Sequence, residues 1–158
     1  MRVLGIDPGF GILGWSVIES DLVIVDYGAI ETSPLLSFDE RIYHIHSALK
    51  KIIAEYSPDF VAIEKLFFQR NTTTAMDVAK AIGAVVLTLR MCNLSYQEYS
   101  PSQIKQAITG YGRASKEQMQ QVIRKIFNLK EIPRPDDAAD ALAIAACHCL
   151  KSGCKLAL

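Results

Sequence analysis

Apolar runs separated by short polar or glycine-containing segments dominate the first part of the chain. Residues 2 to 7, 12 to 19 and 22 to 31 are rich in β-branched and aromatic side chains, and short polar or glycine-containing segments separate them. Segments of this composition joined by short turns are typical of β-hairpins. The pattern predicts an antiparallel meander of three strands.

The period of the pattern changes after the third predicted strand. Between residues 38 and 56, apolar side chains recur at helical spacing with charged side chains opposite, which predicts an amphipathic helix. Beyond it, short apolar runs alternate with segments of helical period. The further expected elements are a strand at 60 to 64, a helix at about 72 to 91 that is rich in small residues, a strand at 95 to 99, a short helix opened by Pro101, a helix from Ser115, and a helix from Asp136 to about Leu150.

This order of elements indicates an α/β fold. Three antiparallel strands followed by parallel crossovers predict a mixed five-stranded sheet flanked by helices, an order that matches the ribonuclease H-like fold. The chain has 158 residues and shows no internal repeat or linker, so we expect one domain over residues 1 to 158.

Two acidic residues directly follow apolar strands. Asp7 ends the first strand, and Glu64 ends the strand at 60 to 64. Parallel strands open on the same edge of a sheet, where α/β folds place their ligands, so we expect the two carboxylates to converge. Either acid, taken alone, also fits the first polar residue of a loop.

The final helix supplies two further acids. Spacing of three places Asp137 and Asp140 on one helix face, and the alanines around them permit close approach to the sheet. Capping and the helix macrodipole favour acids in a first turn, and they account for Asp136 without any chemistry. They account less well for Asp140, which lies a turn further in among apolar residues.

Four carboxylates gathered in one pocket have a chemical consequence. They repel one another, so they either take up protons or require cations. Oxygen ligands without His or Cys select Mg²⁺ or Mn²⁺, and two such ions can activate a water and stabilise the leaving oxygen of a phosphodiester. Asp7, Glu64, Asp137 and Asp140 therefore predict metal-dependent hydrolysis of nucleic acid.

Composition indicates the class of protein and its cellular compartment. Half of the residues are hydrophobic and 22% are charged, as in a soluble globular protein, and no apolar run reaches the length of a membrane span. The N-terminus does not resemble a secretory signal, and the four cysteines lack Cys-x-x-Cys spacing, so we expect reduced, packed thiols in a cytoplasmic protein.

The net charge of zero hides an uneven distribution. Between residues 101 and 135 there are seven Lys and Arg against two Glu, a local balance of +5, which leaves −5 for the rest of the chain. A basic segment beside an acidic remainder suits a protein that holds phosphates in one place and divalent cations in another. A solvated helical surface rich in Lys and Arg explains the basic segment equally well.

Two segments are candidates for DNA contact. Phe67, Phe68 and Arg70 follow the Glu64 strand closely, and adjacent aromatic side chains with a cation can wedge into or stack on bases, although core packing is the common fate of such a pair. Arg113 and Lys116 lie at a helix start that could hold a phosphate, with Ser115 as an ordinary N-cap as the alternative explanation.

Taken together, these residues resemble the RuvC family of Holliday junction resolvases, the crossover junction endodeoxyribonucleases, over nearly the whole chain. The resemblance is carried by five motifs in order. They are Gly5-Ile6-Asp7-Pro8-Gly9 with Gly14, Ile63-Glu64-Lys65-Leu66-Phe67-Phe68 with Asn71, Tyr99-Ser100-Pro101-Ser102-Gln103-Ile104-Lys105, Gly110-Tyr111-Gly112-Arg113-Ala114-Ser115-Lys116, and the segment from Pro135-Asp136-Asp137 to Ala145. One departure is Phe10, where a small hydroxyl residue commonly follows Asp-Pro-Gly.

The resemblance implies several functional properties. The catalytic and metal-binding set would be Asp7, Glu64, Asp137 and Asp140. Phe67 would contact bases at the junction centre, and Lys105 and Lys116 would lie near the scissile phosphate. It also implies a homodimer packed through the helix at 72 to 91, symmetric nicks with 5′-phosphate and 3′-hydroxyl ends, and delivery by the RuvA–RuvB branch-migration complex.

Three alternatives remain at this point. A ribonuclease H-like nuclease acting on RNA or hybrids would share the carboxylates and differ in how it holds its substrate. A non-catalytic junction-binding protein would tolerate neutralisation of the acids. An ATPase of the actin and sugar-kinase kind also begins with an Asp-containing strand and hairpin, but it needs a second domain for which this chain has no room.

Overall fold

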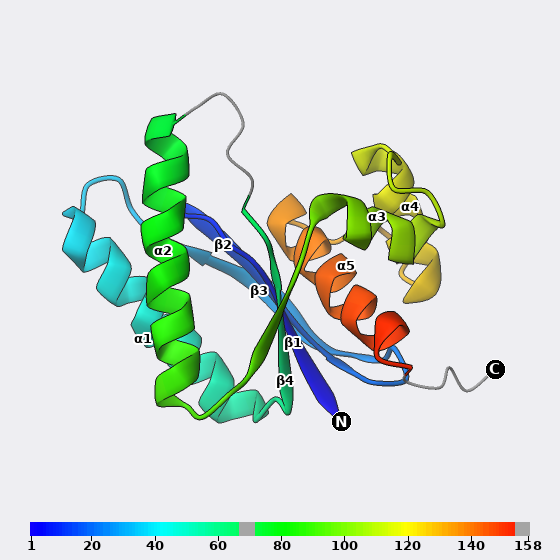
Figure 1. Cartoon of the computed structure of the whole chain (residues 1–158), viewed down its shortest axis with the longest axis horizontal. Coiled ribbons are helices and arrows are strands. Elements are labelled where there is room, and N and C mark those ends of the chain that lie inside the picture. Colours follow the sequence, from blue (N-terminus) through cyan, green and yellow to red (C-terminus); the bar gives the residue numbers. More distant parts are fainter. Residues whose placement is uncertain (67–71, 154–158) are drawn as a thin grey trace.

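The fold is that of a computed structural model, which describes residues 1–66 and 72–153 (Figure 1). Strands and helices alternate after an initial meander. The elements are β1 (Arg2–Asp7), β2 (Ile12–Glu19), β3 (Ile24–Glu31), α1 (Phe38–Tyr56), β4 (Phe60–Glu64), α2 (Thr72–Met91), β5 (Tyr96–Tyr99), α3 (Pro101–Thr109), α4 (Lys116–Ile126) and α5 (Asp136–Lys151).

The strands form one five-stranded sheet in the order β3-β2-β1-β4-β5. β1, β2 and β3 pair antiparallel, whereas β4 pairs parallel with β1 and β5 parallel with β4. The predicted mixed sheet is thereby confirmed. One boundary differs, because Leu22 has a positive φ of 64° and closes a turn on Glu19, so β3 begins two residues later than the apolar pattern predicted.

Helices cover both faces of the sheet (Figure 1). α1 and α2 lie on one face, and α3, α4 and α5 lie on the other. Side chains along β1 alternate between the two cores: Leu4 and Ile6 pack with α1 and α2, whereas Val3 packs with α5. Since successive strand residues point to opposite faces, Gly5 and Asp7 lie on the α5 face.

Local side-chain hydrogen bonds define where several helices begin. Ser37, Ser100 and Ser115 each accept from the backbone N–H three residues on, and the residue at that position bonds back to the cap in each case. The alternative explanation of Ser115 as an ordinary N-cap is therefore correct. Among residues 1–66 and 72–153, none of the helices combines the length and the apolar character that crossing a bilayer requires.

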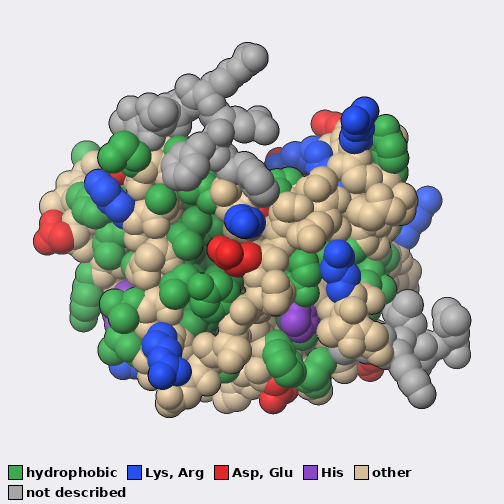
Figure 2. Space-filling model, in the orientation of Figure 1, with side chains coloured by type: hydrophobic (Ala, Val, Ile, Leu, Met, Phe, Trp, Pro, Cys, Tyr) green, Lys and Arg blue, Asp and Glu red, His purple; other side chains and the backbone are tan. Residues whose placement is uncertain are grey.

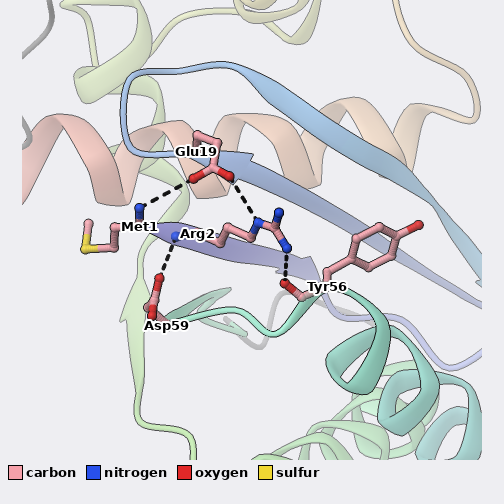
Figure 3. Close-up of polar contacts among 5 residues, drawn as sticks. All are labelled: Met1, Arg2, Glu19, Tyr56 and Asp59. Carbon is pink, nitrogen blue, oxygen red and sulfur yellow. Dashed lines mark hydrogen bonds and ion pairs between the residues drawn. The ribbon is translucent and has the colours of Figure 1, made fainter.

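Polar contacts hold the start of β1, the end of this strand opposite to Asp7 (Figure 3). The guanidinium of Arg2 donates to Glu19 over 3.0 Å and to the carbonyl oxygen of Tyr56 over 2.7 Å. Its backbone N–H donates to Asp59 over 2.7 Å, and the amino group of Met1 reaches Glu19 over 3.4 Å. These bonds join β1, β2 and the α1–β4 connection.

Two glycines permit α5 to lie directly on the sheet. A Cβ atom on Gly5 would come within 2.3 Å of the carbonyl oxygen of Ala141, and one on Gly14 within 2.0 Å of that of Asp137. Gly5 belongs to β1, and Gly14 of β2 pairs with Asp7. The backbone of α5 therefore occupies the space that a side chain would fill, which brings the start of this helix beside the end of β1.

We expect Gly5→Ala to lower the free energy of unfolding by roughly 1 to 3 kcal/mol, because the added methyl group must displace the α5 backbone. Urea unfolding followed by circular dichroism measures this change. Gly11→Ala is the matched control, since its Cβ would meet only the Arg41 guanidinium at 3.7 Å. Equal stability of the two variants would contradict the close contact.

Candidate active site

Asp7 and Glu64 end adjacent parallel strands at the same edge of the sheet. Ile6 of β1 pairs with Ile63 of β4, so the two acids follow their strands at the same level. Both side chains are partly buried. Ala62 belongs to the core on the α5 face, and Glu64, two residues on, therefore points to that face as Asp7 does. The expected convergence of these two carboxylates is present.

The other two acids belong to α5, which packs on one face of the sheet. Asp137 lies where this helix passes over Gly14, and Asp140 follows one turn later. The residues around them, Ala138, Ala139 and Ala141, are buried. One carboxylate oxygen of Asp140, Oδ1, is buried without a hydrogen-bond partner in the described part of the chain. The helix thus carries a buried acceptor that no described side chain satisfies.

The carboxylates raise one another's pKa values. Burial, followed by the charges of Glu64, Asp140 and Asp137, raises the pKa of Asp7 to about 8. Burial and the charge of Asp140 raise the pKa of Glu64, against a hydrogen bond with Asp7 that lowers it. Burial also raises the pKa of Asp140, which Lys116 opposes. Asp7, Glu64, Asp137 and Asp140 are therefore close enough to act as one electrostatic unit.

Two lysines lie among these acids. Glu64, Asp140, Lys105 and Lys116 line a cavity of about 230 Å³ whose other walls are apolar, from Pro101, Ile104, Met119 and Ile144. The Nζ atom of Lys116 donates to Oδ2 of Asp140 over 3.1 Å. Partial burial lowers the pKa of Lys116, but the bond to Asp140 and the charges of Asp140, Asp136 and Asp137 outweigh it and raise that pKa.

Asp136 makes contacts that the sequence did not predict. Pro135 occupies the N-cap position of α5 and makes no side-chain cap bond, whereas Asp136 lies in the first turn, where the macrodipole favours an acid as expected. Its carboxylate instead meets Lys116 at 3.6 Å and the Arg134 guanidinium at 2.5 Å. The sequence did contain a signal for this position: Asp136 precedes Asp140 by four residues, and residues four apart share a helix face.

The other candidates lie in different surroundings. Arg113 is exposed on the connection between α3 and α4. Figure 2 shows Lys and Arg side chains spread over the α3–α4 side of the molecule, in keeping with the basic segment. Phe67, Phe68 and Arg70 lie outside the described residues.

The unusual Phe10 has a packing role. Its ring stacks on Phe38 with 5.1 Å between ring centroids, and the Arg41 guanidinium lies over it at 3.8 Å. Phe10 therefore joins the loop after β1 to the start of α1, on the side of the sheet away from α5.

The donor set fits a hard divalent cation. It consists of carboxylate oxygens, burial and the neighbouring acids raise the pKa values of Asp7 and Asp140, and Oδ1 of Asp140 is buried without a partner among the described residues. Within residues 1–66 and 72–153, no three acidic, His or Cys side chains already stand in a coordinating arrangement. The ammonium of Lys116 occupies the position of a counter-ion instead, on Oδ2 of Asp140.

Comparison with known proteins extends these findings. The sequence model described as "Crossover junction endodeoxyribonuclease RuvC" matches residues 3–148. RuvC of Caldicellulosiruptor saccharolyticus is 51% identical over 96% of this chain and 94% of its own, and RuvC of Thermotoga petrophila is 48% identical over 96% and 94%. The structure of Thermus thermophilus RuvC in complex with a Holliday junction substrate is similar with a TM-score of 0.89 and 35% identity, over 99% of this chain and 97% of that one.

The sheet order and the acids at the ends of β1 and β4, faced by α5, define a nuclease of the ribonuclease H-like class. A yeast mitochondrial Holliday junction resolvase shares this fold at a TM-score of 0.63 with 13% identity. The match over residues 3–148 and the identities near 50% are more specific: the chain belongs to the RuvC family of crossover junction endodeoxyribonucleases.

The raised pKa of Asp7 predicts a pH-dependent stability. The ordinary value is 3.8 and the folded value about 8, so between these pH values the folded chain keeps a proton that the unfolded chain has released. Stability of the metal-free protein should therefore fall as pH rises through this window. At pH 8 we expect Asp7→Asn to be more stable than the wild type by roughly 1 to 3 kcal/mol.

Thermal unfolding in EDTA between pH 5 and pH 9 measures this difference. Asp21→Asn, a change at an exposed acid, should follow the wild type at every pH. Parallel curves for the wild type and Asp7→Asn would show that Asp7 does not carry the effect.

Proposed function

We propose that this chain resolves four-way DNA junctions by symmetric hydrolysis of two phosphodiester bonds, leaving 5′-phosphate and 3′-hydroxyl nicks, in recombination and repair. The observation that carries the proposal is the clustering of acids: Glu64 and Asp140 line one pocket with two lysines, and Asp7 lies close enough to both acids for their charges to raise its pKa. Membership of the RuvC family supports it, as does the relative from T. thermophilus in complex with a Holliday junction substrate.

Asp7, Glu64, Asp137 and Asp140 would hold the cofactor, which we infer to be two Mg²⁺ ions, with Mn²⁺ able to substitute. When bound, such ions activate a water and stabilise the leaving oxygen of a phosphodiester. Asp7 must release its proton before it can act as a ligand, because burial and its acidic neighbours keep it protonated up to about pH 8.

The remaining residues of the pocket would hold the phosphate. Lys105 and Lys116 line it together with Glu64 and Asp140, so an incoming phosphate meets two ammonium groups beside the acids. The apolar wall that includes Ile104 and Met119 limits water on the far side. Cations near a phosphate offset the negative charge that would otherwise be repelled by the carboxylates.

We propose that the junction is held outside the pocket by further contacts. Arg113 is exposed beside the start of α4, where it can reach a phosphate of an arm. Phe67, Phe68 and Arg70 are proposed to contact bases at the junction centre, a role that rests on the family resemblance. These contacts would select branched DNA, whereas the carboxylates alone would act on any phosphodiester.

The partners follow from the same resemblance. We propose a homodimer through α2, whose side chains Met76, Leu87 and Met91 are exposed at helical spacing beside exposed Tyr43 of α1. Two copies would place two active sites on one junction. We further propose one nuclease domain over residues 1–158, delivery by a RuvA–RuvB complex, and a cytoplasmic location.

Cleavage of a synthetic four-way junction tests the central proposal. With Mg²⁺, we expect Asp7→Asn, Glu64→Gln, Asp137→Asn and Asp140→Asn each to lower the single-turnover rate by roughly a hundredfold or more. Asp21→Asn, at an exposed acid remote from the pocket, should cleave as the wild type does. Equal cutting by Asp7→Asn and the wild type would refute the assignment.

A linear RNA–DNA hybrid separates the other enzymatic alternative. At one salt concentration, which keeps non-specific phosphate affinity constant, the junction should be cut and the hybrid left intact. Preferred cutting of the hybrid would favour a ribonuclease. A non-catalytic junction-binding protein is the other alternative. It would be favoured if variants with neutralised acids bound the junction and functioned as the wild type does.

The proposed dimer has its own test. We expect Leu87→Glu to convert a dimer into a monomer in light scattering after gel filtration, because a charge would be buried between two copies of α2. Lys51→Glu, at an exposed position of α1, should leave the mass unchanged. A wild type that elutes as a monomer at micromolar concentration would overturn the proposal.

A further inference from the structure

Lys116 lies between two carboxylates of α5 that differ in depth. Its Nζ atom is 3.1 Å from Oδ2 of Asp140 and 3.6 Å from Oδ2 of Asp136. The Asp140 side chain is 22% exposed and that of Asp136 is 41% exposed. Residues four apart on a helix share a face, so the inner acid of the pocket and the outer acid at its rim present their oxygens to one ammonium group.

Each carboxylate has a different remaining partner. The second oxygen of Asp136 accepts from the guanidinium of Arg134, whose side chain is 77% exposed. The second oxygen of Asp140 is buried and has no hydrogen-bond partner in the described part of the chain. Asp136 is therefore anchored from the solvent side, whereas Asp140 retains a buried acceptor that Lys116 does not satisfy.

Lys116 and a divalent cation would compete for Asp140. A doubly charged ion on this carboxylate would repel the ammonium. The ammonium of lysine is a compact charge on a flexible side chain, and it lacks the fixed donor geometry of a guanidinium. It can therefore move from one carboxylate to another with little change of position. Asp136 is the carboxylate already within 3.6 Å.

We propose that Asp136 is a positioning residue, which accepts the ammonium of Lys116 from Asp140 when a divalent cation binds and keeps that lysine at the rim of the pocket. The inference rests on the proposed function, because it assumes that Asp140 is a metal ligand. Without Asp136, Lys116 would have Asp140 as its remaining carboxylate partner and would oppose the metal ion more strongly.

A double-mutant cycle on Mn²⁺ binding tests the proposal without any measurement of cleavage. Binding of Mn²⁺ alone to the DNA-free protein is followed by electron paramagnetic resonance of the free ion. We expect Asp136→Asn to weaken binding roughly threefold to tenfold and Lys116→Met to strengthen it, because the competing ammonium is gone. In the Lys116→Met background, Asp136→Asn should change binding by less than about twofold.

Asp136→Glu provides the conservative rescue, since a longer carboxylate still reaches a flexible lysine, and it should restore wild-type binding. Unchanged binding by Asp136→Asn would overturn the proposal. An equal loss in both backgrounds would also overturn it, because Asp136 would then act only through its long-range charge. If the wild type binds no Mn²⁺, or Asp140→Asn binds as well as the wild type, the proposed metal site itself fails, which is a distinguishable result.

Discussion

The close contact between α5 and the sheet places the acids of this helix beside the ends of β1 and β4. Gly5 and Gly14 leave no side chain between the strands and the helix, and the backbone around Asp137 and Ala141 fills that space. The first turns of α5 consequently lie beside the end of β1. Asp137 and Asp140 face Asp7 and Glu64 because of this contact, although more than seventy residues separate the two pairs in the chain.

The same contact brings several buried carboxylates together, and their negative charges repel one another. Carboxylates withdrawn from water and placed next to one another hold protons far above their ordinary range, as the pKa of about 8 at Asp7 shows. In the described structure, the positive charge nearest to Asp140 comes from Lys116 at the start of α4. This ion pair links α4 to the acids of α5.

Much of the fold could be predicted from local pattern. The bounds of α1, β4 and α2 agree with the periodicity of apolar residues, and serine caps mark the starts of α3 and α4. The start of β3 could not be predicted, because Leu22 adopts a left-handed conformation that its apolar side chain does not signal. The ion pairs of Asp136 could not be predicted for a related reason: its partners Lys116 and Arg134 come from outside its own helix.

The sequence by itself determined the elements and the mixed sheet and named four acids as candidates, since apolar runs, helical period and strand-end position are properties of neighbouring residues. Only the tertiary structure decided which charged side chains contact one another. The lysine on Asp140, the buried oxygen without a partner and the second carboxylate at the rim all depend on how α4 and α5 pack on the sheet. Such distances arise from packing between distant segments, and no local pattern encodes them.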